Sequence, residues 1–205
     1  MRTMSVFSVC ALLLMLMTSV IYAQGPLSID AIGIFPGATI DSALLAEEQK
    51  IFDETSKEIE DLQSKALKVF VTTASPDQVC EWYLANLKAV KSEDALYDFA
   101  DCVNGVTSPV QYSLEYYESS DFEQQYEHDT MIYDGKWVES CLAARAKSSD
   151  GKVLKGGSFS WEYISEDDGR VSLNVSVQDA SFDFEKRVYK PLTSIVIRFV
   201  EHAEW

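Results

Sequence analysis

Few side chains in this chain are of the types that carry out covalent chemistry. A nucleophilic site needs a serine or cysteine beside a base, and the only two histidines are His128 and His202. The best thiol–imidazole pair is Cys141 with His128, because a hairpin through Asp134-Gly135 would bring their strands together. Exported thiols are commonly oxidised or buried, so we assign no catalytic residue. The sequence favours a non-enzymatic role, and an unrecognised hydrolase remains the less favoured alternative.

The sequence also offers no recognisable metal or phosphate site. Glu127, His128 and Asp129 are adjacent, but zinc needs three or four converging ligands and such groups in a turn are usually solvated. The acidic segment 165–169 lacks the spacing of a calcium loop. Gly156-Gly157-Ser158 lacks the final glycine of a nucleophile elbow. We therefore expect no cofactor and no bound metal.

The most distinctive stretch runs from Tyr112 to Trp137, where seven aromatic side chains are interleaved with carboxylates. Tyrosine and tryptophan supply rigid contact area with a polar tip and are enriched at interfaces. Carboxylates beside aromatic rings suit a cationic peptide, a polyamine or a sugar. The alternative is that these rings fill the core of the protein. The candidate binding residues are Tyr112, Tyr116, Tyr117, Tyr126 and Trp137.

The charge of the chain narrows the choice of partner. The formal net charge is −16 at pH 7, from 33 acidic and 17 basic residues. Nucleic acids and anionic lipids both require many lysines and arginines, so neither is an expected partner. The acidic surface favours solubility and would speed encounter with a cationic protein or peptide.

Residues 1–23 predict export. Arg2 precedes a long apolar run, and Ala23 stands before the polar, turn-prone Gln24-Gly25-Pro26. This order is typical of a secretory signal peptide, although an uncleaved membrane anchor is an alternative. After cleavage we expect a single domain over residues 24–205, with no membrane span, in the periplasm or outside the cell.

Three cysteines follow the signal: Cys80, Cys102 and Cys141. An oxidising compartment permits one disulfide, and the Cys80–Cys102 pair closes the shortest loop. The pairs Cys80–Cys141 and Cys102–Cys141 remain open, as does the possibility of three reduced thiols.

The elements that would position these residues follow from the hydrophobic pattern. Amphipathic spacing predicts helices over about 41–65 and 76–90, the second with a Ser75–Gln78 capping box. Apolar runs separated by Asp-Gly turns predict strands, and Leu67–Thr73 predicts one more. The order of elements indicates an α+β domain, with an antiparallel sheet of five or six strands and both helices on one face. The later strands are expected at 110–118, 136–146, 153–164, 171–180 and 192–201.

Two motifs also resemble a known group of proteins. Phe35-Pro36-Gly37-Ala38 is similar to a "YPGA" turn, and residues 72–83 are similar to "T-x-D-S-P-x-x-V-x-x-[FW]-Y". Both occur in uncharacterised exported bacterial α+β domains that are often part of lipoproteins. The resemblance implies an extracytoplasmic domain and carries no catalytic residues.

These observations lead to an expected function. We expect an exported, acidic binding domain that engages a protein or peptide through the stretch from Tyr112 to Trp137. The alternative is a small-ligand carrier with an apolar pocket between the sheet and the 41–65 helix.

Overall fold

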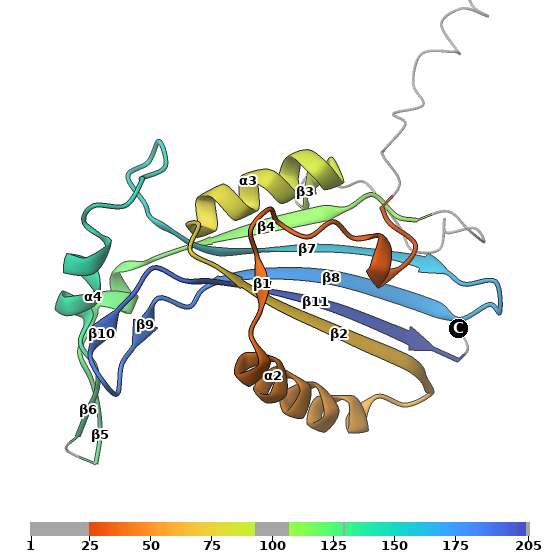
Figure 1. Cartoon of the computed structure of the whole chain (residues 1–205), viewed down its shortest axis with the longest axis horizontal. Coiled ribbons are helices and arrows are strands. Elements are labelled where there is room, and N and C mark those ends of the chain that lie inside the picture. The colour runs from red at the N-terminus through yellow and green to blue at the C-terminus, as the bar shows by residue number, and fades with distance from the viewer. Residues whose placement is uncertain (1–24, 93–106, 129, 204–205) are drawn as a thin grey trace, which may run out of the picture.

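The computed structural model of the chain describes residues 25–92, 107–128 and 130–203 (Figure 1). The expected signal peptide, residues 1–23, and the candidate disulfide partner Cys102 lie outside the described residues. Within the described part, no helix is both long enough and apolar enough to cross a membrane.

Seven strands form the main sheet, namely β1 (Thr39–Ile40), β2 (Leu62–Thr72), β3 (Val90–Lys91), β4 (Gln111–Tyr116), β7 (Leu154–Ile164), β8 (Arg170–Asp179) and β11 (Thr193–His202). Their order across the sheet is β1-β2-β11-β8-β7-β4-β3. All neighbours are antiparallel except β3 and β4, which are parallel. The strand that comes last in the sequence, β11, therefore lies inside the sheet, between β2 and β8.

The remaining elements are helices and two small hairpins. The helices are α2 (Ser42–Thr55), α3 (Pro76–Leu87) and α4 (Gly135–Leu142), with short 3₁₀ turns η1 (Ile29–Ala31), η2 (Ser56–Glu58) and η5 (Ser119–Phe122). The hairpins pair β5 (Gln125–Glu127) with β6 (Thr130–Tyr133), and β9 (Phe182–Asp183) with β10 (Val188–Tyr189).

The predicted α+β class is confirmed, but the sheet differs from the expected one. It has seven strands where five or six were expected, and it is not purely antiparallel. The two additional edge strands, β1 and β3, each contain only two residues. Such short strands leave no periodic pattern in a sequence, because at least four residues are needed to show alternation.

The helices α2 and α3 lie on opposite faces of the sheet (Figure 1). The α3 face carries Ile197 of β11 in the main core. Arg198, the next residue of β11, points the other way and pairs with Glu48 of α2 at 2.7 Å. The prediction that the helices 41–65 and 76–90 share one face is therefore wrong. Each helix has an apolar side, but amphipathic spacing does not say which face of a sheet that side will cover.

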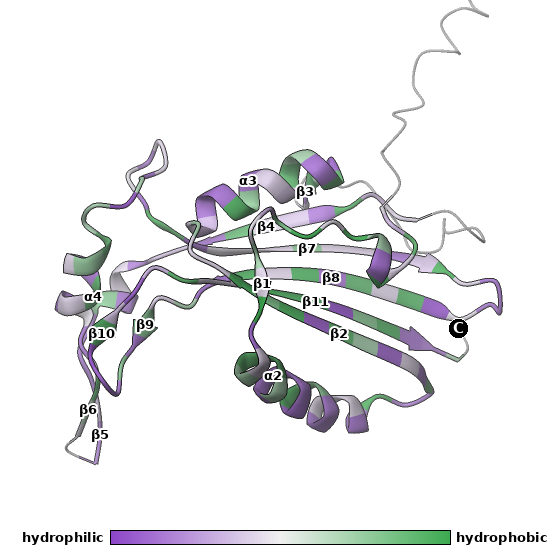
Figure 2. Ribbon diagram, viewed as in Figure 1, coloured by the Kyte–Doolittle hydropathy of each residue, from purple (hydrophilic) through white to green (hydrophobic). Residues whose placement is uncertain are grey.

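The start of α3 follows directly from the sequence. The Ser75 hydroxyl accepts from the Gln78 amide, the Gln78 side chain accepts from the Ser75 amide, and Pro76 occupies the first turn. Val79, Cys80 and Tyr83 then face the sheet and are at most 1 % exposed. The main core is completed by the inward side chains of β7, β8 and β11. The apolar residues of β8 and β11 are coloured green on the ribbon of Figure 2.

Two element boundaries differ from expectation. The helix expected over 41–65 ends at Thr55, and its last residues belong to β2, which begins at Leu62 and pairs with β11. The strand expected over 136–146 is the helix α4. For β2 the deciding contacts come from β11, which is distant in sequence and which local propensity does not contain. For α4 the deciding contact is local, because Asp134 caps the helix instead of forming a turn.

Candidate functional site

An arm projects from one end of the sheet (Figure 1). It consists of residues 118–142, which form η5, the β5–β6 hairpin and α4, together with residues 182–190, which form the β9–β10 hairpin. The arm packs on a second buried cluster, in which Val138 and Leu142 of α4 meet Tyr117, next to the end of β4, and Val153, next to the start of β7. We call it the arm cluster. This cluster is separate from the main core, so the arm is a second packing unit attached to the sheet.

Aromatic side chains join the two parts of the arm. The Tyr133 ring centroid lies 4.9 Å from that of Phe184, and the Trp137 centroid lies 5.6 Å from that of Phe182. The guanidinium of Arg187 lies 5.8 Å from the Trp137 ring. Such ring pairs stabilise beyond the area they bury, so the β9–β10 hairpin is held against α4 and β6.

Asp134 links the same two parts through polar contacts. Its carboxylate caps α4 by accepting from the Trp137 amide at 3.2 Å, and it also pairs with Arg187. The Trp137 amide, with Arg187 nearby, holds the pKa of the Asp134 carboxyl below its usual range. The sequence had suggested that Asp134-Gly135 was a hairpin turn, but the aspartate begins a helix instead.

The arm exposes four large apolar side chains, which we call the arm surface: Tyr126, Ile132, Phe184 and Val188. Their exposed fractions are 62 %, 46 %, 38 % and 48 %. Tyr126 and Ile132 lie on the β5–β6 hairpin, and the other two belong to the segment of the β9–β10 hairpin. Single exposed apolar residues are common on proteins, but several on one projecting unit indicate an interaction site.

The five predicted binding residues fall into different environments. Tyr112 and Tyr116 are half-buried and pack against the main core, with the Tyr112 ring 6.4 Å from that of Phe159. Tyr117 is only 8 % exposed and belongs to the arm cluster. Trp137 is half-buried against the same cluster, and Tyr126 alone among the five is largely exposed.

Three members of the arm surface were absent from the sequence expectation: Ile132, Phe184 and Val188. The available signal for Phe184 and Val188 was the aromatic pattern of residues 182–189, which lies outside the predicted binding stretch from Tyr112 to Trp137. Phe184 and Val188 reach the arm only because the β9–β10 hairpin extends from the ends of β8 and β11.

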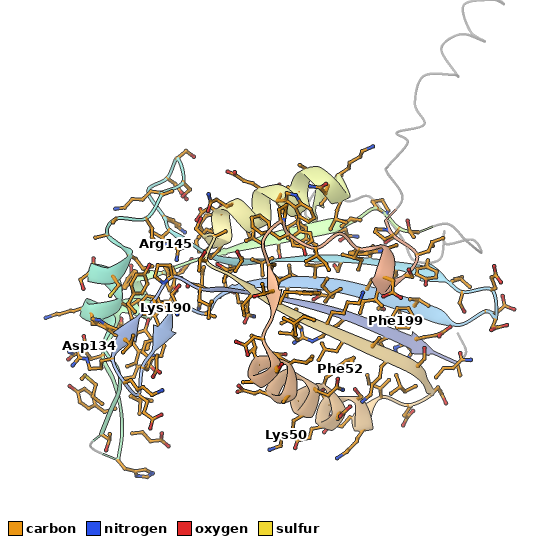
Figure 3. The ribbon with its side chains drawn as sticks, viewed as in Figure 1. Lys50, Phe52, Asp134, Arg145, Lys190 and Phe199 are labelled. Atoms are coloured by element: carbon orange, nitrogen blue, oxygen red, sulfur yellow. The ribbon has the colours of Figure 1, made fainter. Side chains whose placement is uncertain are left out.

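A buried polar network ties the arm to the sheet. Asp179, at the end of β8, has a fully buried side chain and forms an ion pair with Arg145 just beyond α4. Its Oδ2 also accepts from the Tyr117 hydroxyl at 3.0 Å, and Arg145 Nη2 lies 3.5 Å from Asp77 Oδ2 of α3. Arg145 in Figure 3 lies at this junction of the arm and the sheet.

The same network keeps Tyr117 in its neutral form. Burial, followed by the negative charge of Asp179, raises the pKa of the Tyr117 phenol far above its usual value. The phenol therefore remains a hydrogen-bond donor to Asp179 at physiological pH. Arg145 also donates from Nη2 to the Leu154 carbonyl at 3.2 Å, which fixes the guanidinium between strands and arm.

The residues considered for covalent chemistry do not form the expected arrangement. His128 lies at the turn of the β5–β6 hairpin with a positive φ of 48°, whereas Cys141 lies on α4. The hairpin that was to bring their strands together does not form, because residues 135–142 are helical. Among the described residues, no group of three histidine, cysteine or acidic side chains is arranged to hold a metal ion.

Cys80 has the properties of a core residue. Its thiol is free, it is 1 % exposed, and it lies beside Gly157 on the sheet. Burial, with a smaller contribution from Asp77, raises the pKa of this thiol to about 12. The candidate pairing with Cys102 falls outside the described residues, whereas Cys141 is half-buried and also free.

We expect Cys80 to resist alkylation in the native protein at about pH 8, because both its burial and its raised pKa suppress the reactive thiolate. Unfolding in guanidinium without a reductant should release it for rapid labelling, whereas Cys141 should react in the native state. Peptide mass spectrometry after iodoacetamide treatment measures both. Labelling of Cys80 only after reduction would contradict the free thiol and favour a disulfide.

The hollows of the molecule do not match the expected carrier pocket. One of about 410 Å³ lies between α4, η5 and the turn before β7. Two others, of about 390 and 350 Å³, lie on the sheet face beside α2. Of these three described hollows, none is lined by an α2 side chain, and Phe52 fills the space between α2 and the sheet (Figure 3). The side chains that line these two hollows are mostly small and polar, including Ser113, Ser158, Ser160, Ser172, Asn174 and Ser176.

No protein-family model, no curated protein and no solved structure matches this chain. The resemblance of residues 35–38 and 72–83 to exported bacterial domains therefore remains a prediction. The functional argument consequently depends on the geometry of the arm and on the distribution of charge.

Proposed function

We propose that this protein is an extracytoplasmic binding domain that engages another protein or a peptide through the arm surface. The single observation that carries the proposal is the gathering of Tyr126, Ile132, Phe184 and Val188, all exposed, on one projecting unit. Exposed apolar side chains on such a unit lose unfavourable contact with water when a partner covers them.

The attachment of the arm supports the same proposal. The ring contacts between Trp137 and Phe182, and the buried pair of Arg145 and Asp179, hold the arm in one position on the sheet. A surface that is ordered before binding loses less conformational entropy when the partner arrives. The arm is therefore suited to selective recognition.

The location is part of the proposal and derives from residues 1–23, whose pattern is that of a secretory signal. The net charge of −16 argues against a nucleic acid as the partner. The same charge would attract a cationic partner. We place the protein in the periplasm or outside the cell.

Replacing Tyr126 and Ile132 together with serine should reduce partner capture at least about tenfold, because exposed apolar anchors supply much of the energy of an interface. The melting temperature should change little, since both side chains are exposed. The measurement is quantitative mass spectrometry of proteins cross-linked to the chain in its native envelope.

The matched control replaces Ile40 and Ile51 with serine. These residues are 64 % and 47 % exposed, close to the values for Tyr126 and Ile132, but they lie on β1 and α2, outside the arm. A true partner should be retained by the control and lost by the arm variant. Equal retention by both variants would contradict the proposed function.

A further inference from the structure

We propose that the arm receives an extended segment of its partner as an added strand along the open edge of β5, and that this segment alternates basic and apolar side chains. The inference depends on the proposed protein-binding function and adds the chemistry of the bound segment. It follows from the edge, the pleat and the charge of the β5–β6 hairpin.

The edge of β5 is available for pairing. The hairpin is a sheet of two strands, so β5 is hydrogen-bonded to β6 on one side and to no other strand among the described residues. All three residues of β5 are exposed. An open edge presents unpaired backbone N–H and C=O groups, which an extended peptide can satisfy by adding as a further strand.

The pleat of the hairpin determines what the added strand should carry. Tyr126 is paired with Met131 and points to one side, whereas Glu127 is paired with Thr130 and points to the other side. The register shifts between Gln125 and Tyr126, so Ile132 lies at a β-bulge opposite them. A strand beside β5 would place alternate side chains next to Tyr126 and next to Glu127. Apolar residues fit the first position and lysine or arginine fits the second.

The charge around the hairpin supports a basic segment. Residues 118–134 contain six acidic residues and no lysine or arginine. The carboxylates of Glu123 and Glu127 have no ion-pair partner among the described residues. In the neighbouring β9–β10 hairpin, by contrast, Lys186 and Arg187 are already paired with aspartates of the arm.

The same charge argues against a second copy of this chain as the occupant of the edge. Two β5 strands placed side by side would bring the Glu123 and Glu127 carboxylates of both copies together, and like charges facing each other across strands are destabilising. The net charge of −16 adds to this repulsion at long range. A segment of opposite charge meets neither penalty.

The test uses a short fluorescent peptide of alternating lysine and valine, with the purified chain and anisotropy as the readout. We expect binding that weakens as salt rises, because exposed ion pairs are screened. A version with alternate backbone amides methylated should bind at least about tenfold more weakly, since strand pairing requires those N–H groups. A peptide in which glutamate replaces lysine should bind more weakly still.

Variants locate the site on the arm. Glu127→Gln should weaken binding of the lysine–valine peptide about two- to fivefold, the size expected for one exposed ion pair. The control Glu54→Gln, an exposed position of α2, should leave binding unchanged.

Three results would overturn the inference: equal binding of the methylated peptide, equal binding of the glutamate peptide, or no binding of any peptide at concentrations up to about 1 mM. None of these results bears on the serine variants of Tyr126 and Ile132. If cross-linking to a partner still requires those two residues, the arm binds protein by another mode and the proposed function stands.

Discussion

Replacing Asp179 with alanine is expected to lower the free energy of unfolding by about 3–5 kcal/mol. The side chain is fully buried, and its loss leaves the Arg145 guanidinium, which is 11 % exposed, without its closest counter-charge. The Tyr117 hydroxyl and the Ser181 amide also lose the oxygen atoms to which they donate. Urea unfolding monitored by tryptophan fluorescence measures the change.

Two further variants separate the causes of this loss. Tyr117→Phe removes one neutral donor to Asp179 and should cost much less than the alanine change, about 1 kcal/mol. Combining Asp179→Leu with Arg145→Met removes both charges and should recover at least half of the lost stability, because buried ion pairs often exchange for apolar pairs at little cost. A loss below about 1 kcal/mol for Asp179→Ala would show that the pair is not a stabilising junction.

Replacing Gly135 with alanine is expected to destabilise the arm by about 3 kcal/mol or more. A Cβ atom at this position would overlap the backbone of Phe122, so α4 and η5 would have to separate. The buried Val138 and Leu142 of α4 would then lose their packing in the arm cluster. Hydrogen exchange followed by mass spectrometry measures the effect segment by segment.

The pattern of exchange is the decisive part of the Gly135 experiment. Protection should fall in residues 118–142 and 182–190, whereas β7 and β8 should keep theirs, because the main core contains neither α4 nor η5. The neighbouring change Lys136→Ala, at an exposed position of the same helix, serves as the control and should shift stability by less than about 0.5 kcal/mol. Uniform loss of protection would contradict a separate packing unit.

Local signals in the sequence predicted the elements that depend on local contacts. The capping box of Ser75 and Gln78 predicted the start of α3, and the Asp168-Gly169 turn predicted the hairpin of β7 and β8. Strict alternation in Val171–Val177 predicted β8 and its buried face. The cap and the turn are fixed by contacts within a few residues, and the alternation of β8 shows which of its side chains face the core.

Two elements were mispredicted, and the reasons differ. Asp61 and Lys65 are charged residues at helical spacing, but residues 62–65 belong to β2, where Lys65 pairs with Val200 of β11. Asp134-Gly135 has the composition of a turn, yet the aspartate caps α4. The helical spacing of Val138 and Leu142 was the available signal for α4, and the turn dipeptide outweighed it.

The candidate site could be predicted only in part, because some of its contacts join residues that are distant in sequence. The stretch from Tyr112 to Trp137, predicted as a binding region, contains the β5–β6 hairpin of the proposed site. Composition could not separate Tyr117, which is buried, from Tyr126, which is exposed, because their sequence surroundings are alike. Phe184 and Val188 join the arm surface through the hairpin between β8 and β11, a contact that no local pattern contains.

The position of β11 between β2 and β8 has a consequence for the timing of folding. β2 has only the two-residue β1 as its other neighbour, so its main partner is β11, more than a hundred residues later in the chain. β8 likewise lacks one full neighbour until residues 193–202 have been synthesised. Contacts so distant in sequence form slowly. A nascent chain that lacks β11 therefore cannot complete the sheet, and β2 stays unjoined to the β7–β8 hairpin until residues 193–202 have been synthesised.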